Sequence, residues 1–94
     1  MHRYVVERDI PKIGSAEHAA LRAAAQKSNG VLDDMRAEKK HIQWEHTYVA
    51  GDKTFCIYLA DSEALIYEHS ERSGFPATVV TEVRTIIDPL TADS

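Results

Sequence analysis

The chain has 94 residues, a formal net charge of −4 and one cysteine. This length fits one domain with a single core, the acidic balance argues against a protein that follows nucleic-acid phosphates, and a lone cysteine excludes an internal disulfide. No apolar segment approaches the roughly 20 residues that cross a bilayer, and residues 1–8 lack the apolar run of a signal peptide. We therefore expect a cytoplasmic protein with neither nucleic acid nor membrane as a partner.

The first half of the chain predicts a strand followed by a helix. Residues 2–8 alternate between two sides as a strand does, and Pro11 and Gly14 end this pattern. Ser15 is a plausible N-cap for the helix, and Asn29-Gly30 offers a stop or an interruption. Small and apolar residues recur at helical spacing, namely Leu21, Ala24, Ala25, Ser28, Leu32 and Met35. The alanine-rich face predicts close packing of this helix on a sheet.

The second half predicts a hairpin, a helix and a last strand. Residues 41–49 and 54–59 alternate with period 2, and Gly51-Asp52 between them is typical of a two-residue turn. The helix begins at Asp61 or Ser62 and ends at Gly74. Residues 78–87 are rich in β-branched side chains and predict a strand. We place the single domain at residues 1–87 and a polar tail at residues 88–94.

The element order β-α-β-β-α-β predicts an α+β, ferredoxin-like fold, with a four-stranded antiparallel sheet and both helices on one face. A chain of this size buries little surface alone. We therefore expect a homodimer.

The Gly51-Asp52 turn also predicts which side chains share a side of the sheet. One side is apolar and is expected beneath the helices; it carries Trp44, His46, Tyr48, Phe55, Ile57 and Leu59. The other side is polar and carries Glu7, Glu45, Thr47, Cys56, Tyr58, Glu82 and Arg84. In the ferredoxin-like strand order, Glu7, Cys56 and Glu82 are expected to meet at one corner of this polar side.

Two carboxylates and a thiol at one corner favour a metal site if a second copy covers them, since desolvated carboxylates require a cation. Cross-strand ion pairs with Arg8 or Arg84 are the more common role of such carboxylates.

Two histidines offer another possible metal site. His69 shares a helical stripe with Leu65 and Ile66 and is predicted to face the sheet, where His46 is expected beneath the helices. An imidazole pair in this position can bind a divalent metal, although two hydrogen-bonded core histidines are more common.

The sequence contains no His-Glu-x-x-His, paired Cys-x-x-Cys, phosphate-binding glycine loop or Gly-x-Ser-x-Gly, so we do not expect an enzyme. An alternative is a small-molecule-binding or catalytic barrel whose cavity is lined by Cys56, Tyr58, Glu82 and Arg84. A deep apolar pocket with a few polar groups would favour this alternative. A filled interior with paired carboxylates would instead favour an interaction module.

Several short blocks resemble the small bacterial nickel-binding proteins of ferredoxin-like fold. They are Arg3-Tyr-Val-Val-Glu-Arg-Asp-Ile-Pro11, Trp44, Tyr48-Val49, Asp52-Lys53, Cys56-Ile-Tyr58, Glu68-His69, Gly74-Phe-Pro-Ala77 and Thr81-Glu-Val83. The resemblance implies a dimeric α+β barrel that binds nickel, for sequestration or metal tolerance.

We take Glu7, Cys56, His69 and Glu82 as candidate metal ligands. All four fall within the resembling blocks, whereas His46 does not. Carboxylate, thiolate and imidazole also suit copper, zinc or cobalt, so the preference for nickel comes from the resemblance alone.

Overall fold

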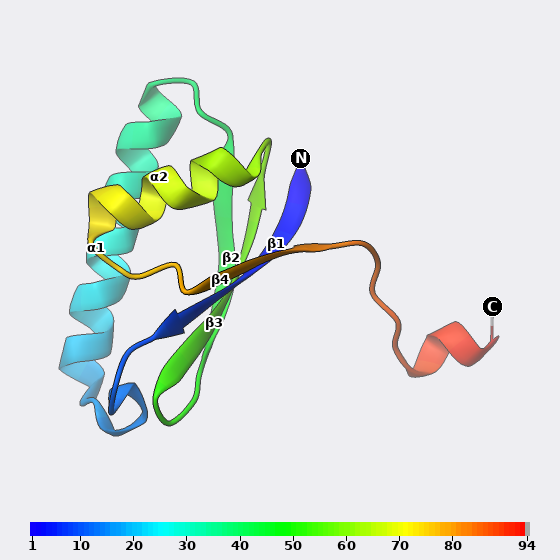
Figure 1. Cartoon of the computed structure of the whole chain (residues 1–94), viewed down its shortest axis with the longest axis horizontal. Coiled ribbons are helices and arrows are strands. Elements are labelled where there is room, and N and C mark those ends of the chain that lie inside the picture. Colours follow the sequence, from blue (N-terminus) through cyan, green and yellow to red (C-terminus); the bar gives the residue numbers. More distant parts are fainter. Residues whose placement is uncertain (94) are drawn as a thin grey trace.

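The computed structural model describes residues 1–93 as a four-stranded antiparallel sheet with two α-helices on one face (Figure 1). The elements are β1 (His2–Asp9), a 3-10 turn η1 (Ile13–Ser15), α1 (His18–Ala37), β2 (Ile42–Val49), β3 (Lys53–Ala60), α2 (Glu63–Ser73), β4 (Val79–Val83) and a second 3-10 turn η2 (Pro89–Asp93). The strand order is β2-β3-β1-β4. The predicted ferredoxin-like α+β fold is thus confirmed. Ser94, which ends the predicted tail, lies outside the described residues.

The helix ends follow the sequence signals in part. α2 begins after Ser62 and ends at Gly74, whose φ of 82° is a left-handed conformation that favours glycine. α1 begins after Glu17, two residues later than predicted, because Ser15 belongs to η1. The helix also continues through Gly30, where glycine costs roughly 0.5–1 kcal/mol relative to alanine. The buried residues Leu32 and Met35 beyond Gly30 favour its continuation.

The β2–β3 hairpin keeps the predicted grouping of side chains near the turn and departs from it beyond a bulge. Tyr48 pairs with Phe55 and His46 with Ile57, but a bulge between Trp44 and His46 makes Trp44 pair with Tyr58. A bulge inserts one residue into a strand and reverses the side on which the following side chains lie. Trp44 therefore packs against the core, while His46 lies on the opposite side and is exposed.

The helices cover the side of the sheet that was predicted to be open. The core contains Tyr4 and Val6 of β1, which pair with Tyr58 and Cys56 of β3. Together with Arg8 and Thr54, these residues make up the helix side of the central strands. The predicted placement of Cys56 and Tyr58 away from the helices is therefore wrong.

The reason for this reversal lies in β1. Both sides of β3 are sufficiently apolar to pack, but Arg3 pairs with Leu59 and Glu7 with Phe55, not with the Cys56 side as predicted. Helices over the side of Phe55 and Leu59 would therefore have covered Arg3 and Glu7, and buried unpaired charges are costly. The opposite side of the central strands, here called the open side, carries Arg3, Val5, Glu7, Phe55, Ile57 and Leu59, all half-buried.

The last strand is shorter than predicted. β4 ends at Val83, and the chain beyond it extends away from the body (Figure 1). Ile86, Ile87 and Leu90 in this extension expose 63%, 77% and 75% of their surface. Within residues 1–93, neither α-helix combines the length and apolar character needed to span a membrane.

Candidate functional site

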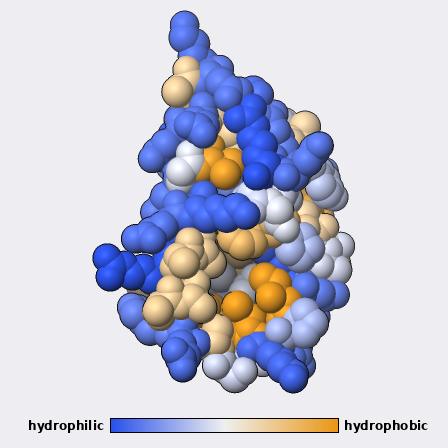
Figure 2. Space-filling model, turned by 90° about the vertical axis from the view of Figure 1, so that its left-hand side faces the viewer, coloured by the Kyte–Doolittle hydropathy of each residue, from blue (hydrophilic) through white to orange (hydrophobic). Residues whose placement is uncertain are grey.

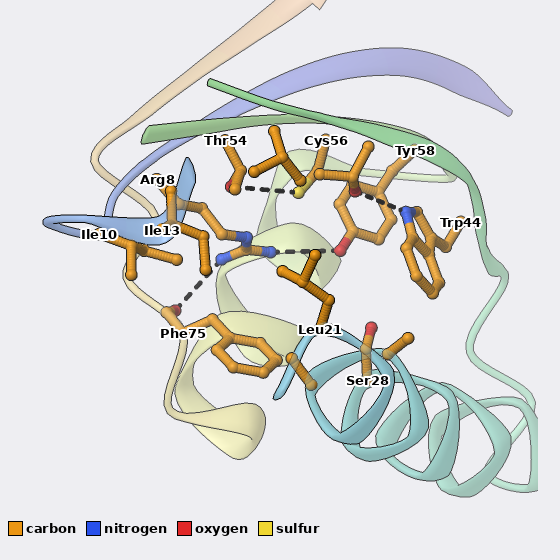
Figure 3. A pocket seen from close by; sticks show the side chains of 14 residues that line it. Arg8, Ile10, Ile13, Leu21, Ser28, Trp44, Thr54, Cys56, Tyr58 and Phe75 are labelled. Atoms are coloured by element: carbon orange, nitrogen blue, oxygen red, sulfur yellow. Dashed lines mark hydrogen bonds between the residues drawn. The ribbon is translucent and has the colours of Figure 1, made fainter. Parts of the chain in front are cut away.

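A pocket of about 240 Å³ lies between α1 and the helix side of the sheet (Figure 3). Its walls are largely apolar and come from the loop after β1, from α1, from the β2–β3 hairpin and from the loop after α2; they include Ile10, Ile13, Leu21, Val49 and Phe75. Hydrophobic residues gather on the lower part of the face that α1 presents (Figure 2). This pocket differs from the predicted cavity, because only Cys56 and Tyr58 of the four predicted lining residues border it.

The alanines of α1 explain why this space exists. Ala24 and Ala25 line the pocket, together with Leu21 and Ser28 on the same helical face. The alanine-rich face predicts close packing on the sheet, but these short side chains leave a cavity over β3 instead. Farther along α1, Leu32 and Met35 are fully buried and close the interior.

Backbone hydrogen bonds hold the loop after β1 against the tip of the β2–β3 hairpin. The amide of Gly14 donates to the Gly51 carbonyl at 2.9 Å, and the amide of Ile10 donates to the Asp52 carbonyl at 3.0 Å. A Cβ at Gly14 would lie 2.5 Å from the Ala50 carbonyl oxygen, so this approach requires glycine. The contact places Ile10 and Ile13 at the wall of the pocket.

Arg8 projects from β1 into the pocket and is only 2% exposed. Its Nη1 donates to Ser70 Oγ at 2.9 Å, to the Phe75 carbonyl at 3.2 Å and to the Pro76 carbonyl at 3.0 Å. Its Nη2 donates to the Tyr58 hydroxyl at 3.3 Å, and the guanidinium lies between the Tyr58 and Phe75 rings (Figure 3). Within residues 1–93 no carboxylate pairs with Arg8. A buried charge therefore borders the pocket with only neutral partners.

A hydrogen bond between Ser28, which lines the pocket, and the buried His69 connects the pocket to the core. Ser28 Oγ lies 3.1 Å from His69 Nε2, while His69 Nδ1 is buried and has no hydrogen-bond partner in the described chain. Burial, and then the positive charge of Arg8, lowers the pKa of His69 to about 4. Burial also raises the pKa of Tyr58, an effect that Arg8 partly offsets. His69 and Tyr58 are thus both neutral near pH 7.

The predicted corner of Glu7, Cys56 and Glu82 is not formed within one chain. Glu7 lies on the open side, 3.6 Å from Lys53 Nζ, whereas Cys56 is buried on the helix side. Glu82 lies opposite Tyr4, three residues along β1 from Glu7, and its Oε1 is 3.1 Å from His2 Nδ1.

His46 and His69 lie on opposite sides of the sheet. His69 faces the sheet as predicted and is 1% exposed, but the prediction that His46 lies beneath the helices is wrong. No group of three or more His, Cys, Asp or Glu side chains within residues 1–93 is close enough to hold a metal ion. The side chains of residues 1–93 in one copy therefore do not form a nickel site by themselves. The ligand roles of Glu7, Cys56, His69 and Glu82 remain predictions.

From the sequence, Arg8 was expected only as the ion-pair partner of a nearby carboxylate. The available signal was the alternation along β1, which puts Arg8 on the same side as Tyr4 and Val6. Once those two residues are assigned to the core, Arg8 must point beneath the helices as well.

Comparison with known proteins places the chain in a family. The family model described as "Nickel responsive protein SCO4226-like" matches residues 4–83. The chain belongs to this family. Among solved structures, it is similar to the crystal structure of SCO4226 from Streptomyces coelicolor A3(2), with a TM-score of 0.73 and 17% sequence identity over 90% of this chain and 99% of the other. At this identity the similarity shows the fold alone. No curated protein matches the sequence.

Proposed function

We propose that this protein binds nickel in the cytoplasm, for sequestration or tolerance of the metal, and that the ion lies between two copies of the chain. Membership of the nickel-responsive family is the observation that carries this proposal. Because the described part of one chain contains no group of three ligand side chains, a second copy is needed to complete the coordination.

The open side of the sheet supports a homodimer. Val5, Phe55, Ile57 and Leu59 are half-buried there, and Tyr48 and Val79 expose 62% and 45% of their surface. Apolar side chains gathered on a sheet face that the helices leave uncovered are typical of a protein contact. Two copies stacked on their open sides would exclude water from these side chains and form the dimeric α+β barrel.

Glu7 and His46 lie on this same open side. Carboxylate and imidazole are suitable nickel ligands, and each would occur twice in the dimer. Cys56 and His69 offer a thiol and an unpaired imidazole nitrogen on the other side. The buried charge of Arg8 disfavours a cation near His69, so we rank the open side first.

Calorimetry with nickel on the tag-free protein, combined with light scattering, tests this proposal. We expect stoichiometric binding by a dimer, and affinity lowered at least tenfold by Glu7→Gln or His46→Gln. Glu71→Gln, on the exposed surface of α2, is the matched control. Absence of stoichiometric nickel binding would contradict the proposal. If only Cys56→Ser or His69→Gln loses nickel binding, the nickel site lies on the helix side. If only Glu82→Gln loses it, the site lies at the edge of the sheet.

A second candidate function is the binding of a small organic molecule in the pocket. The carrying observation is a cavity of about 240 Å³ with apolar walls and a few convergent polar groups. Its volume exceeds the roughly 150 Å³ of a cavity that admits benzene and falls below the roughly 300 Å³ at which sites for drug-sized ligands begin. A ligand of about one ring fits these limits. The pocket lies away from the open side, so a dimer formed there would leave it accessible.

A further inference from the structure

We propose that the pocket between α1 and the sheet binds a small apolar monocarboxylate, with its carboxylate on the guanidinium of Arg8. This inference rests on the second candidate function and names its class of ligand. The nickel proposal stands independently of it, because the two sites use opposite sides of the sheet.

The charge of Arg8 is the first argument. A buried cation is normally paired with an anion, since neutral oxygens replace only part of its lost hydration. Arg8 is 2% exposed and its partners are two hydroxyls and two carbonyls. Among residues 1–93, no Asp or Glu lines the pocket, and Arg8 is the one charged residue that does. An entering anion would meet an opposite charge, whereas a cation would be repelled.

The donor geometry of Arg8 is the second argument. Three acceptors crowd Nη1, whereas Nη2 makes one long bond of 3.3 Å to Tyr58 and Nε makes none within the described residues. Nε and Nη2 form one edge of the guanidinium, the edge that binds a carboxylate through two parallel hydrogen bonds. The less satisfied edge is therefore the one suited to a carboxylate.

The shape and polarity of the remaining walls are the third argument. Ile13, Leu21 and Phe75 present apolar surface around Arg8 (Figure 3). Ala25 of α1 also lines the pocket. This surface would bury the hydrocarbon part of a ligand while Arg8 holds its acid group. Within about 240 Å³, one aromatic ring or a short branched chain fits beside a single carboxylate.

Calorimetry and thermal shift with matched probes test the proposal on the intact protein. Benzoate, phenylacetate and isovalerate are compared with benzamide, phenylacetamide and benzylamine at constant ionic strength. We expect at least one acid to bind with a submillimolar Kd and to raise the Tm, its amide to bind at least tenfold more weakly, and the amine not to bind. Equal binding of acid and amide would overturn the role of Arg8 but keep the pocket as a small-molecule site. No binding of any probe would overturn both.

Two variants locate the binding. Arg8→Met should remove the preference for acid over amide, and Ala25→Leu should fill the pocket and abolish binding of every probe without touching Arg8. Should Arg8→Met fail to fold, Ala25→Leu together with the acid–amide comparison in the unmodified protein still decides the outcome. Unchanged acid binding in folded Ala25→Leu would overturn the proposal. Nickel binding by Ala25→Leu should equal that of the unmodified protein, which separates the two functions.

Discussion

His69 and Arg8 show that the interior is not a purely apolar core. His69 is 1% exposed, contacts the Tyr58 ring at 5.4 Å between centroids and has one nitrogen without a partner. Such a group is buried at low cost only while it is neutral. The low pKa of His69, about 4, is the electrostatic consequence of burial beside Arg8.

The pKa of His69 predicts a loss of stability in mild acid. The unfolded chain binds a proton at His69 near pH 6.5 and the folded chain near pH 4, so the free energy of unfolding should fall as the pH drops through this interval. The contribution is about 2–3 kcal/mol. Chemical denaturation at pH 4.5–7.5 measures it.

His69→Asn is the variant that isolates this effect, because other groups also titrate in the interval. Its unfolding free energy should depend less steeply on pH than that of the unmodified protein. Equal pH dependence in the two proteins would show that His69 is not held neutral by the fold.

At the residue scale, the sequence predicted the position of His69 but not that of Cys56. The helical spacing of His69 from Leu65 and Ile66 correctly placed it toward the sheet. Cys56 lies on a strand with small or apolar side chains on both sides, so alternation alone could not tell which side is covered. Cys56 pairs with the core residue Val6 of β1, which places Cys56 on the helix side. This pairing is known only once the strands are assembled into the sheet.

At the scale of elements, local signals predicted the strands and the end of α2 because each depends on few residues. Gly74 adopts the left-handed conformation that its position after α2 predicts. The bulge in β2 was missed, since nothing in the sequence of residues 42–49 interrupts period 2. This single insertion moved Trp44 to the helix side. His46 keeps its predicted partner Ile57 and lies on the open side because the helices cover the opposite face of the sheet, which removes the predicted imidazole pair.

Salt bridges tie the C-terminal end of α1 to α2 and hold both helices over the sheet. Arg72 donates to both carboxylate oxygens of Glu38 at 2.7 Å, and Lys40 Nζ lies 2.7 Å from Glu68 Oε2. The hydrogen bonds from Arg72, and then from Lys40, lower the pKa of Glu38 to about 2. Because these groups are solvent-accessible, the pairs orient the helices more than they stabilise the fold.

Gly14→Ala tests the contact between the loop after β1 and the hairpin. The new methyl group would lie 2.5 Å from the Ala50 carbonyl oxygen and 2.9 Å from Gly51 Cα, so one backbone segment must move. We expect a loss of about 1–3 kcal/mol in unfolding free energy, by analogy with overpacked interiors. Pocket binding of benzoate should weaken too, because Ile13 moves with the loop.

Gly30→Ala is the matched control for this substitution. A Cβ at Gly30 would meet no described atom within 4 Å apart from the neighbouring backbone of α1, in which the residue lies. Alanine should therefore stabilise the protein by about 0.5–1 kcal/mol. Denaturation curves of both variants should shift in opposite directions; a shared direction would contradict the account of Gly14.

At the scale of the whole molecule, the sheet separates two surfaces of different character. The helix side contains the pocket and Arg8, whereas the open side combines apolar residues with Glu7 and His46. The sequence predicted that a second copy would cover the side without helices. It misassigned the residues there, because the choice between two packable sides depends on β1 and β3 together.

The extension beyond β4 predicts a further contribution to the dimer. Ile86, Ile87 and Leu90 are more than 60% exposed and leave the body of one chain, where a second copy can cover them. Removal of residues 84–94 should raise the dimer dissociation constant at least tenfold, since fully burying one such side chain contributes roughly 1.5–3 kcal/mol. Sedimentation of both forms measures it, and an unchanged constant would place the extension outside the interface.

A crystal structure grown with nickel, with anomalous scattering recorded at the nickel absorption edge, would locate the ion and its ligands. We expect an anomalous peak between the open sides of two copies, with Glu7 and His46 among the ligands of the ion. A nickel ion coordinated entirely within one chain, or copies that leave their open sides apart, would contradict this expectation.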